Sequence, residues 1–220
     1  MLKSLCLLLF LPSSLFATAS FSLDQISGQF PSQGFEEKIE FWRTIFTHYG
    51  EREVLLHDQD DLQLIYEVVT FDKGIRNDDA EFRRQRTELR KRERQLQQIL
   101  DEIRGWGLHS DRLTQEHHRI IRVLKSHGYT LKSAELRKLK GNIRYQRGIK
   151  EKFREGLIRS GKYLSTIEQT LRQHGVPVEL AFLPHVESSF DYSSYSKRGA
   201  AGIWQFMRST GRQYMTISSY

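Results

Sequence analysis

One glutamate in this chain follows directly on an apolar run, and this placement suits it to acid–base chemistry. Glu187 comes after residues 180–186, which read Leu-Ala-Phe-Leu-Pro-His-Val. An acid held against apolar surface has its charged form disfavoured, so its pKa rises and it can carry a proton near neutral pH. Taken alone, a glutamate at the end of a helix is most often a solvated residue. The residues around Glu187 must therefore decide between the two interpretations.

The segment after Glu187 places polar side chains and glycines in an otherwise apolar stretch. A serine stands nine residues after the glutamate, and a Gly/Ala-rich turn leads into a second apolar segment with one amide. Taken separately, Ser196 can be only a cap and Gln205 only a surface amide, and Asp191 reads as a turn or cap residue. The residues that this pattern singles out are Ser188, Ser196, Gly199, Gly202, Gln205 and Met207.

Together these residues form one motif without gaps, with Glu-Ser at 187–188, the serine at 196, and G-A-x-G-[LI]-x-Q-x-M at 199–207. From Ile143 to the C-terminus the chain resembles the catalytic domain of lytic murein transglycosylases of the soluble-lytic-transglycosylase type, glycoside hydrolase family 23. The resemblance implies a mainly α, lysozyme-like catalytic domain. It also implies that further helices of the domain would lie beyond Tyr220, so that the chain is C-terminally truncated and holds the first half of the domain or less.

The resemblance assigns a role to each residue of the motif. Glu187 matches the single catalytic acid/base of the family. Trp204 stands where the family often has methionine, and it is either a platform for a sugar or part of the core. The remaining implied roles are substrate binding for Ser196, Gln205 and Met207, and the structure of the loop for Ser188, Gly199 and Gly202.

The implied reaction is cleavage of the β-1,4 bond between N-acetylmuramic acid and N-acetylglucosamine in peptidoglycan, with a 1,6-anhydromuramyl product. No metal or cofactor is implied, because the nucleophile is the substrate's own C6 hydroxyl. The zinc-binding pattern HExxH is also absent from the sequence. The alternative is a truncated, non-catalytic envelope protein that binds peptidoglycan or is a decayed remnant of the enzyme.

The first residues predict export. Lys3 precedes an apolar run at 5–11, and residues 17–19 read Ala-Thr-Ala, a small-residue cleavage site. The run is shorter than the ~20 residues that a membrane-spanning helix needs, and Pro12 breaks it. We therefore expect a signal peptide at residues 1–19 and a protein that acts in the periplasm or elsewhere in the bacterial cell envelope.

The composition is basic and poor in cysteine. The chain has 34 Lys+Arg against 27 Asp+Glu, a formal net charge of +7, and Cys6 within the expected signal peptide is its one cysteine. A basic balance favours nucleic acid, anionic lipid headgroups or an anionic wall polymer as partners. The export signal and the lack of a nucleic-acid-binding motif argue against nucleic acid. We expect the glycan strands of peptidoglycan as the partner, while association with a membrane or the cell wall and the oligomeric state stay open.

The spacing of apolar residues predicts one long helix over residues 81–104. Phe82, Leu89, Leu96 and Ile103 fall at strict intervals of seven. Such a narrow apolar face suits packing along another long helix, as in a helical hairpin or coiled coil. The arginine cluster at 83–94 is either a polyanion-binding face or, as is more common for such a run, the solvated side of the helix.

Helical spacing is also present at 36–49 and at 142–173, where glycines interrupt the apolar stripe. Ser110-Asp111 offer caps for a helix that follows, and Pro177 opens another. Residues 54–69 are ambiguous, and we favour a helix after a short extended piece.

The expected organisation is mainly α. A signal peptide at 1–19 and a flexible leader at 20–35 precede a helical, partly coiled-coil-like N-terminal region at 36–141. The incomplete lysozyme-like transglycosylase domain then occupies 142–220.

Overall fold

The computed structural model describes residues 34–76 and 78–216 and is mainly α-helical, which confirms the predicted fold class. The predicted signal peptide at 1–19 lies outside these residues, as does nearly all of the predicted leader at 20–35. None of the described helices combines the length and the apolar composition that crossing a membrane requires.

The chain forms two compact units. Among the described residues, unit 1 joins residues 34–43 to 150–216, and unit 2 is residues 44–76 and 78–149. Helix α3, Glu36–Thr47, begins in unit 1 and ends in unit 2, and it confirms the helix predicted at 36–49. The apolar residues of α3 that are buried are Phe41, Ile45 and Phe46.

Unit 2 contains a three-stranded antiparallel sheet that sequence spacing did not predict. Its strands are β1 (Glu53–Asp58), β2 (Ile65–Thr70) and β3 (Ile143–Arg147), in the order β2-β1-β3. The prediction of a helix within residues 54–69 is therefore wrong, and residues 36–141 are not helical throughout.

The central position of β1 explains this error. Residues 54–56, Val-Leu-Leu, have no exposed area, because β1 is paired on both edges and covered on both faces. A strand buried in this way reads as a continuous apolar run without alternation, and such a run cannot be told from a buried helix by its period. The partner β2 does alternate in part, with Val69 buried between the exposed Val68 and Thr70.

The two ends of unit 2 are joined by backbone hydrogen bonds. The Gly148 N–H donates to Glu53 O at 2.9 Å, and the Ile149 N–H donates to Ile45 O at 3.1 Å. Gly148 passes so close to Tyr49 that a Cβ would lie 2.3 Å from the carbonyl carbon and oxygen of Tyr49, so only glycine fits there. Strand β3 thus returns the chain to the place where the unit begins.

The long helix predicted at 81–104 is α4, Asp79–Trp106. Asp78 caps its first turn by accepting a hydrogen bond from the Glu81 N–H at 2.8 Å. Three of the four residues at intervals of seven are buried, while Phe82 is 39% exposed. The buried residues of the helix are Gln85, Leu89, Leu96, Leu100 and Ile103.

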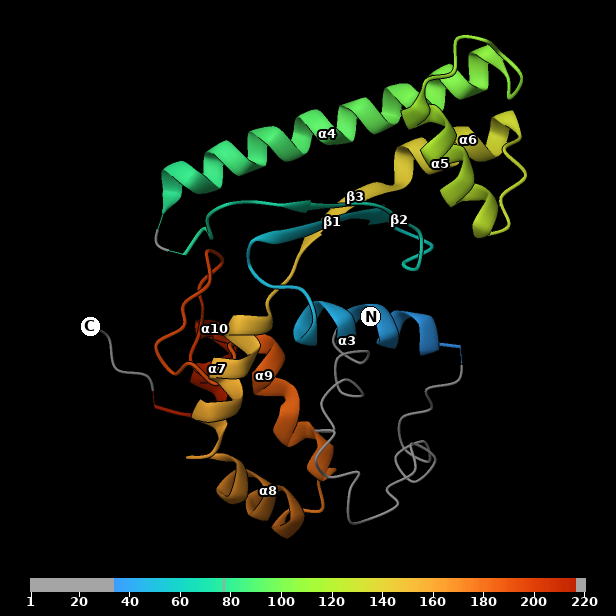
Figure 1. Ribbon diagram of the computed structural model, residues 1–220. Coiled ribbons are helices and arrows are strands. Elements are labelled where there is room, and N and C mark those ends of the chain that lie inside the picture. Colours follow the sequence, from blue (N-terminus) through green and yellow to red (C-terminus); the bar gives the residue numbers. More distant parts are fainter. Residues whose placement is uncertain (1–33, 77, 217–220) are drawn as a thin grey trace. The chain divides into compact units, whose positions relative to one another are not determined.

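The partners of α4 differ from those predicted. The helix lies along the sheet and packs against β3 and against α6, Ser133–Asn142, near its C-terminal end (Figure 1). Among the described helices no second one matches its length, so the expected long helical partner is wrong. Helix α5, Gln115–Ser126, completes this core, and Thr114 caps it in place of the predicted Ser110-Asp111.

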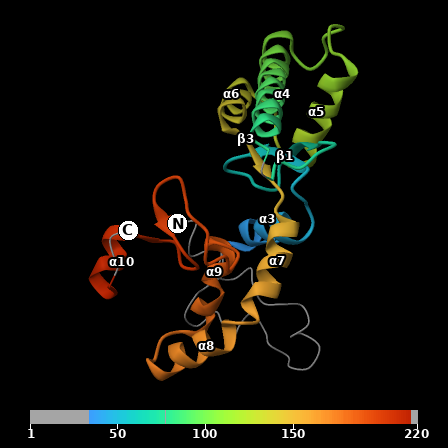
Figure 2. The same ribbon diagram turned by 90° about the vertical axis from the view of Figure 1, so that its left-hand side faces the viewer.

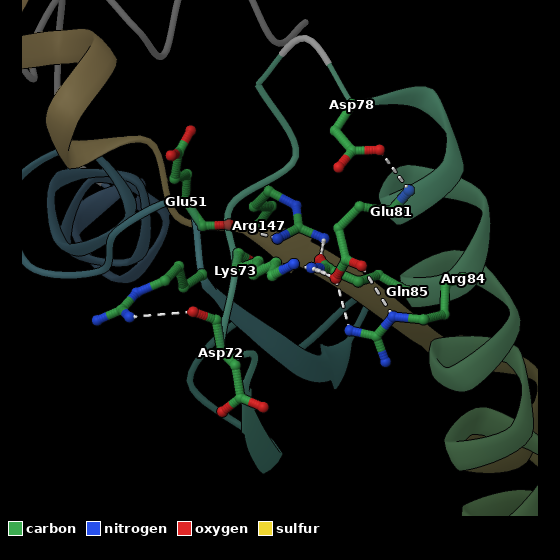
Figure 3. Close-up of polar contacts among 9 residues, drawn as sticks. Glu51, Asp72, Lys73, Asp78, Glu81, Arg84, Gln85 and Arg147 are labelled. Carbon is green, nitrogen blue, oxygen red and sulfur yellow. Dashed lines mark hydrogen bonds and ion pairs between the residues drawn. The ribbon is translucent and has the colours of Figure 1, made fainter.

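A buried polar network fastens the first turns of α4 to the sheet (Figure 3). The Gln85 side chain, which has no exposed area, donates to Lys73 O at 2.8 Å and to Glu81 Oε1 at 2.6 Å. Its Oε1 accepts from Arg147 Nη2 at 2.8 Å, and Arg147 also donates to Glu51 O. Because each polar atom of the Gln85 side chain has a partner, the network stabilises one position of α4 on the sheet.

The helical prediction at 142–173 is wrong at its start, because residues 143–147 form strand β3. The rest of that stretch is two helices of unit 1, α7 (Lys150–Ser160) and α8 (Leu164–Gln173). After Pro177 the 3₁₀ helix η3, Val178–Phe182, leads into α9, Leu183–Glu187. Figure 2 shows the last helix, α10, set apart from α7 and α8 by a loop. That loop carries the short strands β4 and β5, and the last elements are β4 (Ala200–Ala201), β5 (Phe206–Met207) and α10 (Arg208–Tyr214).

Candidate active site

Glu187 is the last residue of α9, and a sharp turn ends the helix there. Ser189 and Phe190 both adopt left-handed backbone conformations, with φ of 57° and 55°. This region is sterically costly for residues other than glycine, and it tends to occur where the surroundings enforce it, often at functional sites. The turn directs the chain away from α9 immediately after the glutamate.

Buried contacts hold this turn in place. Ser188, only 1% exposed, donates its hydroxyl to Ile203 O at 2.8 Å and so ties the end of α9 to the loop that follows. The Phe190 N–H donates to Pro184 O at 3.1 Å. The Phe190 ring has no exposed area and lies parallel to the Tyr163 ring, with centroids 6.4 Å apart. The backbone on either side of Glu187 is therefore fixed by groups in its own unit.

Helix α7 contacts the same turn from another side. Gly156 lies so close to Ser189 that a Cβ would be 2.9 Å from Ser189 Cβ and 3.0 Å from its carbonyl oxygen. Arg159, one turn along the helix, donates from Nε to Ser189 O at 2.9 Å. Ser189, the left-handed residue two positions after Glu187, is thus packed against Gly156 and hydrogen-bonded to Arg159.

The loop after the turn closes into a small sheet. Strand β4 pairs with β5 through Ala200 with Met207 and Ala201 with Phe206, and Tyr195 bridges to Ala201. Gly199 and Gly202 have φ of 87° and 75°, the left-handed conformation that glycine adopts without strain. These two glycines allow the tight reversals between the strands.

Polar side chains of the loop bond within the loop. The Ser196 hydroxyl accepts from the Ala200 N–H at 2.9 Å. The Gln205 amide nitrogen donates to Ser194 O at 3.1 Å and to Gly202 O at 2.9 Å. Gln205 itself has a positive φ of 49°, so its side chain stabilises a backbone conformation that it would otherwise disfavour. Among the described residues, no partner accepts from the Ser196 hydroxyl and none donates to the side-chain oxygen of Gln205.

An open hollow of about 530 Å³ lies over this loop and α10. Its lining is mainly apolar and strongly aromatic, and several of these side chains are exposed, including Tyr192 at 74% and Tyr195 at 75%. A concave apolar surface with a few polar groups is the usual form of a ligand site. The side chains that line it are aromatic or apolar at Tyr192, Tyr195, Ile203, Trp204, Phe206, Met207 and Met215, together with the cation of Arg208.

The turn, the loop and the hollow belong to one stretch of sequence that matches a known family. Residues 165–219 match the transglycosylase SLT domain. The match confirms the predicted resemblance to lytic transglycosylases over about a quarter of the chain. We call residues 165–219 the SLT segment.

Part of the chain is also similar to curated proteins. The membrane-bound lytic murein transglycosylase D of Escherichia coli (strain K12) is 44% identical to this chain over 57 residues, which are 26% of this chain and 13% of the relative. The protein of the same name from E. coli O6:H1 (strain CFT073) matches to the same extent. The chain therefore matches only a small part of the length of these relatives. No solved structure matches the chain significantly.

The residues predicted for the site divide into two groups in the SLT segment. Gly199, Gly202 and Met207 line the hollow. Ser188, Ser196 and Gln205 hold the turn and the loop through hydrogen bonds, and Glu187, half-buried at the end of α9, is not among the lining residues. The prediction that Asp191 is a turn residue is confirmed, because its Oδ1 accepts from the Ser193 N–H and hydroxyl at 2.9 and 2.6 Å.

Sequence reasoning missed the aromatic groups on both sides of Glu187. Tyr163 and Phe190 stack beneath the turn, and His185 lies edge-on to Phe190 with ring centroids 4.5 Å apart. The tyrosines at 192 and 195 line the hollow. The density of aromatic residues between 182 and 206 was a signal for such a surface, but their spacing does not show which of them face inward.

His185 is the buried ionisable group of α9. It is 2% exposed and contacts the rings of Phe153, Phe182 and Phe190. Burial lowers the pKa of His185 from 6.5 to about 4, because the apolar surroundings disfavour the imidazolium. The neutral ring is therefore the form that the folded SLT segment contains at neutral pH.

We expect the SLT segment to lose stability in mild acid because of His185. Between pH 6.5 and about 4 the unfolded chain binds a proton that the folded chain does not, so the contribution of His185 is complete above pH 6.5 and is lost as the pH falls to 4. The loss amounts to about 3 kcal/mol. Urea unfolding between pH 7.5 and 4.5 gives the free energy of unfolding of the wild type and of His185→Phe at each pH. The loss due to His185 is the extra decrease in the wild type as the pH falls. Parallel profiles would contradict the assignment to His185.

Proposed function

We propose that this chain carries the acid/base end of a peptidoglycan lytic transglycosylase. The reaction is cleavage of the β-1,4 bond between N-acetylmuramic acid and N-acetylglucosamine, with Glu187 as the single acid/base. The observation that supports it best is that the match to the SLT domain family includes Glu187 at the end of α9, in a turn that Ser188 ties to the loop around the hollow.

The proposed chemistry needs one carboxyl group. Glu187 first donates its proton to the glycosidic oxygen, so that N-acetylglucosamine leaves with a hydroxyl group. The Glu187 carboxylate then takes the proton of the muramyl C6 hydroxyl while the C6 oxygen bonds to C1. This bond closes the 1,6-anhydro ring. The proton that Glu187 gives is regained, and no water is consumed. Asp191, the nearest second carboxyl along the chain, is bonded to Ser193 in its own turn, which supports a mechanism without a second catalytic carboxylate.

The loop supplies the surface on which a sugar would bind. Trp204 and Tyr195 line the hollow with large apolar faces and polar edges, the combination that aromatic side chains bring to binding sites. Met207 extends the apolar wall, and the Ser196 hydroxyl and Gln205 carbonyl offer hydrogen bonds to hydroxyl or acetamido groups. In this proposal Ser196 and Gln205 both shape the loop and contact the sugar.

The openness of the hollow favours one alternative, a protein that binds peptidoglycan without cleaving it. Tyr192, Tyr195 and Met215 are between 51% and 75% exposed, so the hollow is accessible, while Glu187 does not line it. Such a protein would retain sugars on the loop without bringing the carboxyl group to the bond.

Digestion of purified murein sacculi distinguishes these two functions. The soluble products are analysed by mass spectrometry, because a 1,6-anhydro product is lighter by one water than the product of hydrolysis. We expect anhydromuropeptides from the intact chain. Retention of the protein on sacculi with no soluble product would support the binding protein, and products with reducing ends would contradict a transglycosylase.

A further inference from the structure

Helix α4 carries a row of arginines on the side that faces away from the core. Arg83, Arg86, Arg90 and Arg94 are separated by three, four and four residues, so they lie on one face of the helix. All four are exposed, as is Lys91 beside them. The row runs for about 16 Å along the helix axis. We call these four residues the arginine stripe.

Among the described residues, the stripe differs from the other arginines of α4 in having no ion partners. Arg84 pairs with Glu81, Arg92 with Glu67 and Glu88, and Arg104 with Asp101. Within residues 34–76 and 78–216, no ion pair or hydrogen bond engages the side chains of the four stripe arginines or of Lys91. The helix therefore balances the charge of its other arginines and leaves that of the stripe unbalanced.

The local charge of this face is strongly positive. The stripe and Lys91 contribute five cations, while two carboxylates of α4, the half-buried Glu93 and the exposed Asp79 one turn before Arg83, form no ion pair among the described residues. Four of the five cations are arginines, whose planar forks bind phosphate in a bidentate way and whose charge persists at any physiological pH. Uncompensated arginines in a row are thus suited to a dense array of phosphates.

The stripe also lacks the features of a protein-binding surface. Interfaces between proteins have apolar and aromatic centres that are depleted in charge, and the centre of this face is cationic. No large apolar side chain interrupts the stripe between Arg83 and Arg94, because Leu89 lies on the buried face of the helix. A flat and densely charged partner therefore fits this face better than a folded protein does.

We propose that the arginine stripe is a docking surface for a membrane whose headgroups are anionic phospholipids. A straight helix touches a planar surface along its length, so all four arginines reach phosphates at once without inserting into the acyl chains. The buried network of Gln85 and Arg147 fixes α4 on the sheet, so the stripe is presented by a rigid element. The choice of lipid over nucleic acid rests on the proposed function in the envelope.

Vesicle binding of the intact chain tests this proposal. Partition onto vesicles of equal parts phosphatidylglycerol and phosphatidylcholine is compared with partition onto phosphatidylcholine alone. The difference gives the electrostatic contribution to the binding free energy. Each cation near an anionic surface contributes about five-fold in binding, which corresponds to about 1 kcal/mol. We expect Arg86→Gln/Arg90→Gln/Arg94→Gln to weaken binding to the anionic vesicles about 100-fold. The wild-type preference for anionic vesicles should also fall as salt is added.

A matched variant removes the same charge elsewhere. Arg84→Gln/Arg104→Gln/Arg172→Gln loses three arginines that have carboxylate partners, and we expect it to bind within about three-fold of the wild type. Glutamine has nearly the helix propensity of arginine, so circular dichroism should show both variants folded. Equal losses in the two triple variants would overturn the proposal, because net charge and not the stripe would then set binding.

Two further results separate this proposal from nucleic-acid binding and from the proposed function. Tighter binding to duplex DNA than to anionic vesicles at equal phosphate concentration would overturn the choice of lipid. Sacculi contain no lipid bilayer, so the stripe variant should release the same soluble products from them as the wild type. If the stripe variant loses vesicle binding but digests sacculi as the wild type does, the result supports the docking surface. If the wild type binds vesicles but does not digest sacculi, the result counts against the transglycosylase function and not against the docking surface.

Discussion

Glu187→Gln should lower the rate of anhydromuropeptide release by about 10²–10⁴-fold, the usual contribution of a positioned acid/base. Glutamine has the shape of glutamate but can neither give a proton to the glycosidic oxygen nor take one from the C6 hydroxyl. We expect the turn to persist in this variant, because Ser188, Phe190 and Arg159 make contacts that hold it. The measurement is the initial rate of soluble product from sacculi, with the melting temperature as a check on folding.

Asp191→Asn is the matched control for the same assay. Asparagine retains the side-chain oxygen that accepts from Ser193, so the turn after Phe190 should persist. We expect this variant to keep activity within a few-fold of the wild type. If Asp191→Asn were as inactive as Glu187→Gln, the reaction would need two carboxyl groups and the single acid/base mechanism would be wrong.

Gly156→Val should unfold the region around the candidate acid. A valine at this place in α7 would bring its Cβ and methyl groups into contact with the backbone of Ser189. Ser189 is already in a left-handed conformation, so moving its backbone costs further free energy. Overpacking of this kind costs about 1–3 kcal/mol, and we expect a value near the upper end because the contact is with backbone. Hydrogen exchange of peptides from 150–190 measures the loss directly.

Gly161→Ala is the control for this substitution. Its Cβ would meet Ile158 O at 3.5 Å, an ordinary van der Waals contact, so the fold has room for it. We expect exchange in residues 150–190 to change little in this variant. Protection that is equally lost in both variants would mean that any side chain in place of a glycine is harmful here, and that the contact of Gly156 with Ser189 is not the cause.

The fold was predictable from sequence where it depends on local periodicity. Leu89, Leu96 and Ile103 identified the buried face of α4, because an α-helix repeats every few residues regardless of its partner. Strand β3 was not predictable in this way. It pairs Ile143 with Asp58 across a long stretch of chain, and its own short sequence, Ile-Arg-Tyr-Gln-Arg, has only two alternating apolar residues, too few to distinguish a strand from a helix. The identity of the packing partners of α4 depends on that distant pairing.

In the candidate site, too, the features set by local sequence were predictable and those set by tertiary contacts were not. The motif around Glu187 located the turn and its glycines, because positions that need a left-handed backbone favour glycine. It did not predict that Ser196 and Gln205 bond to their own loop, since which carbonyl an amide meets depends on how the loop closes. The positive φ of Ser189 and Phe190 was equally hidden, because neither residue type indicates that conformation.

The hydrogen bonds that join the first and last residues of unit 2 give this part of the chain the character of an insertion. Gly148 bonds to Glu53 and Ile149 to Ile45, so the polypeptide leaves the unit at the point where it entered. Segments with adjacent ends can be gained, lost or exchanged between proteins without altering the distance that the flanking chain must span. The SLT segment and the module that bears the arginine stripe can therefore have separate evolutionary histories, each acquired or modified without rebuilding the other.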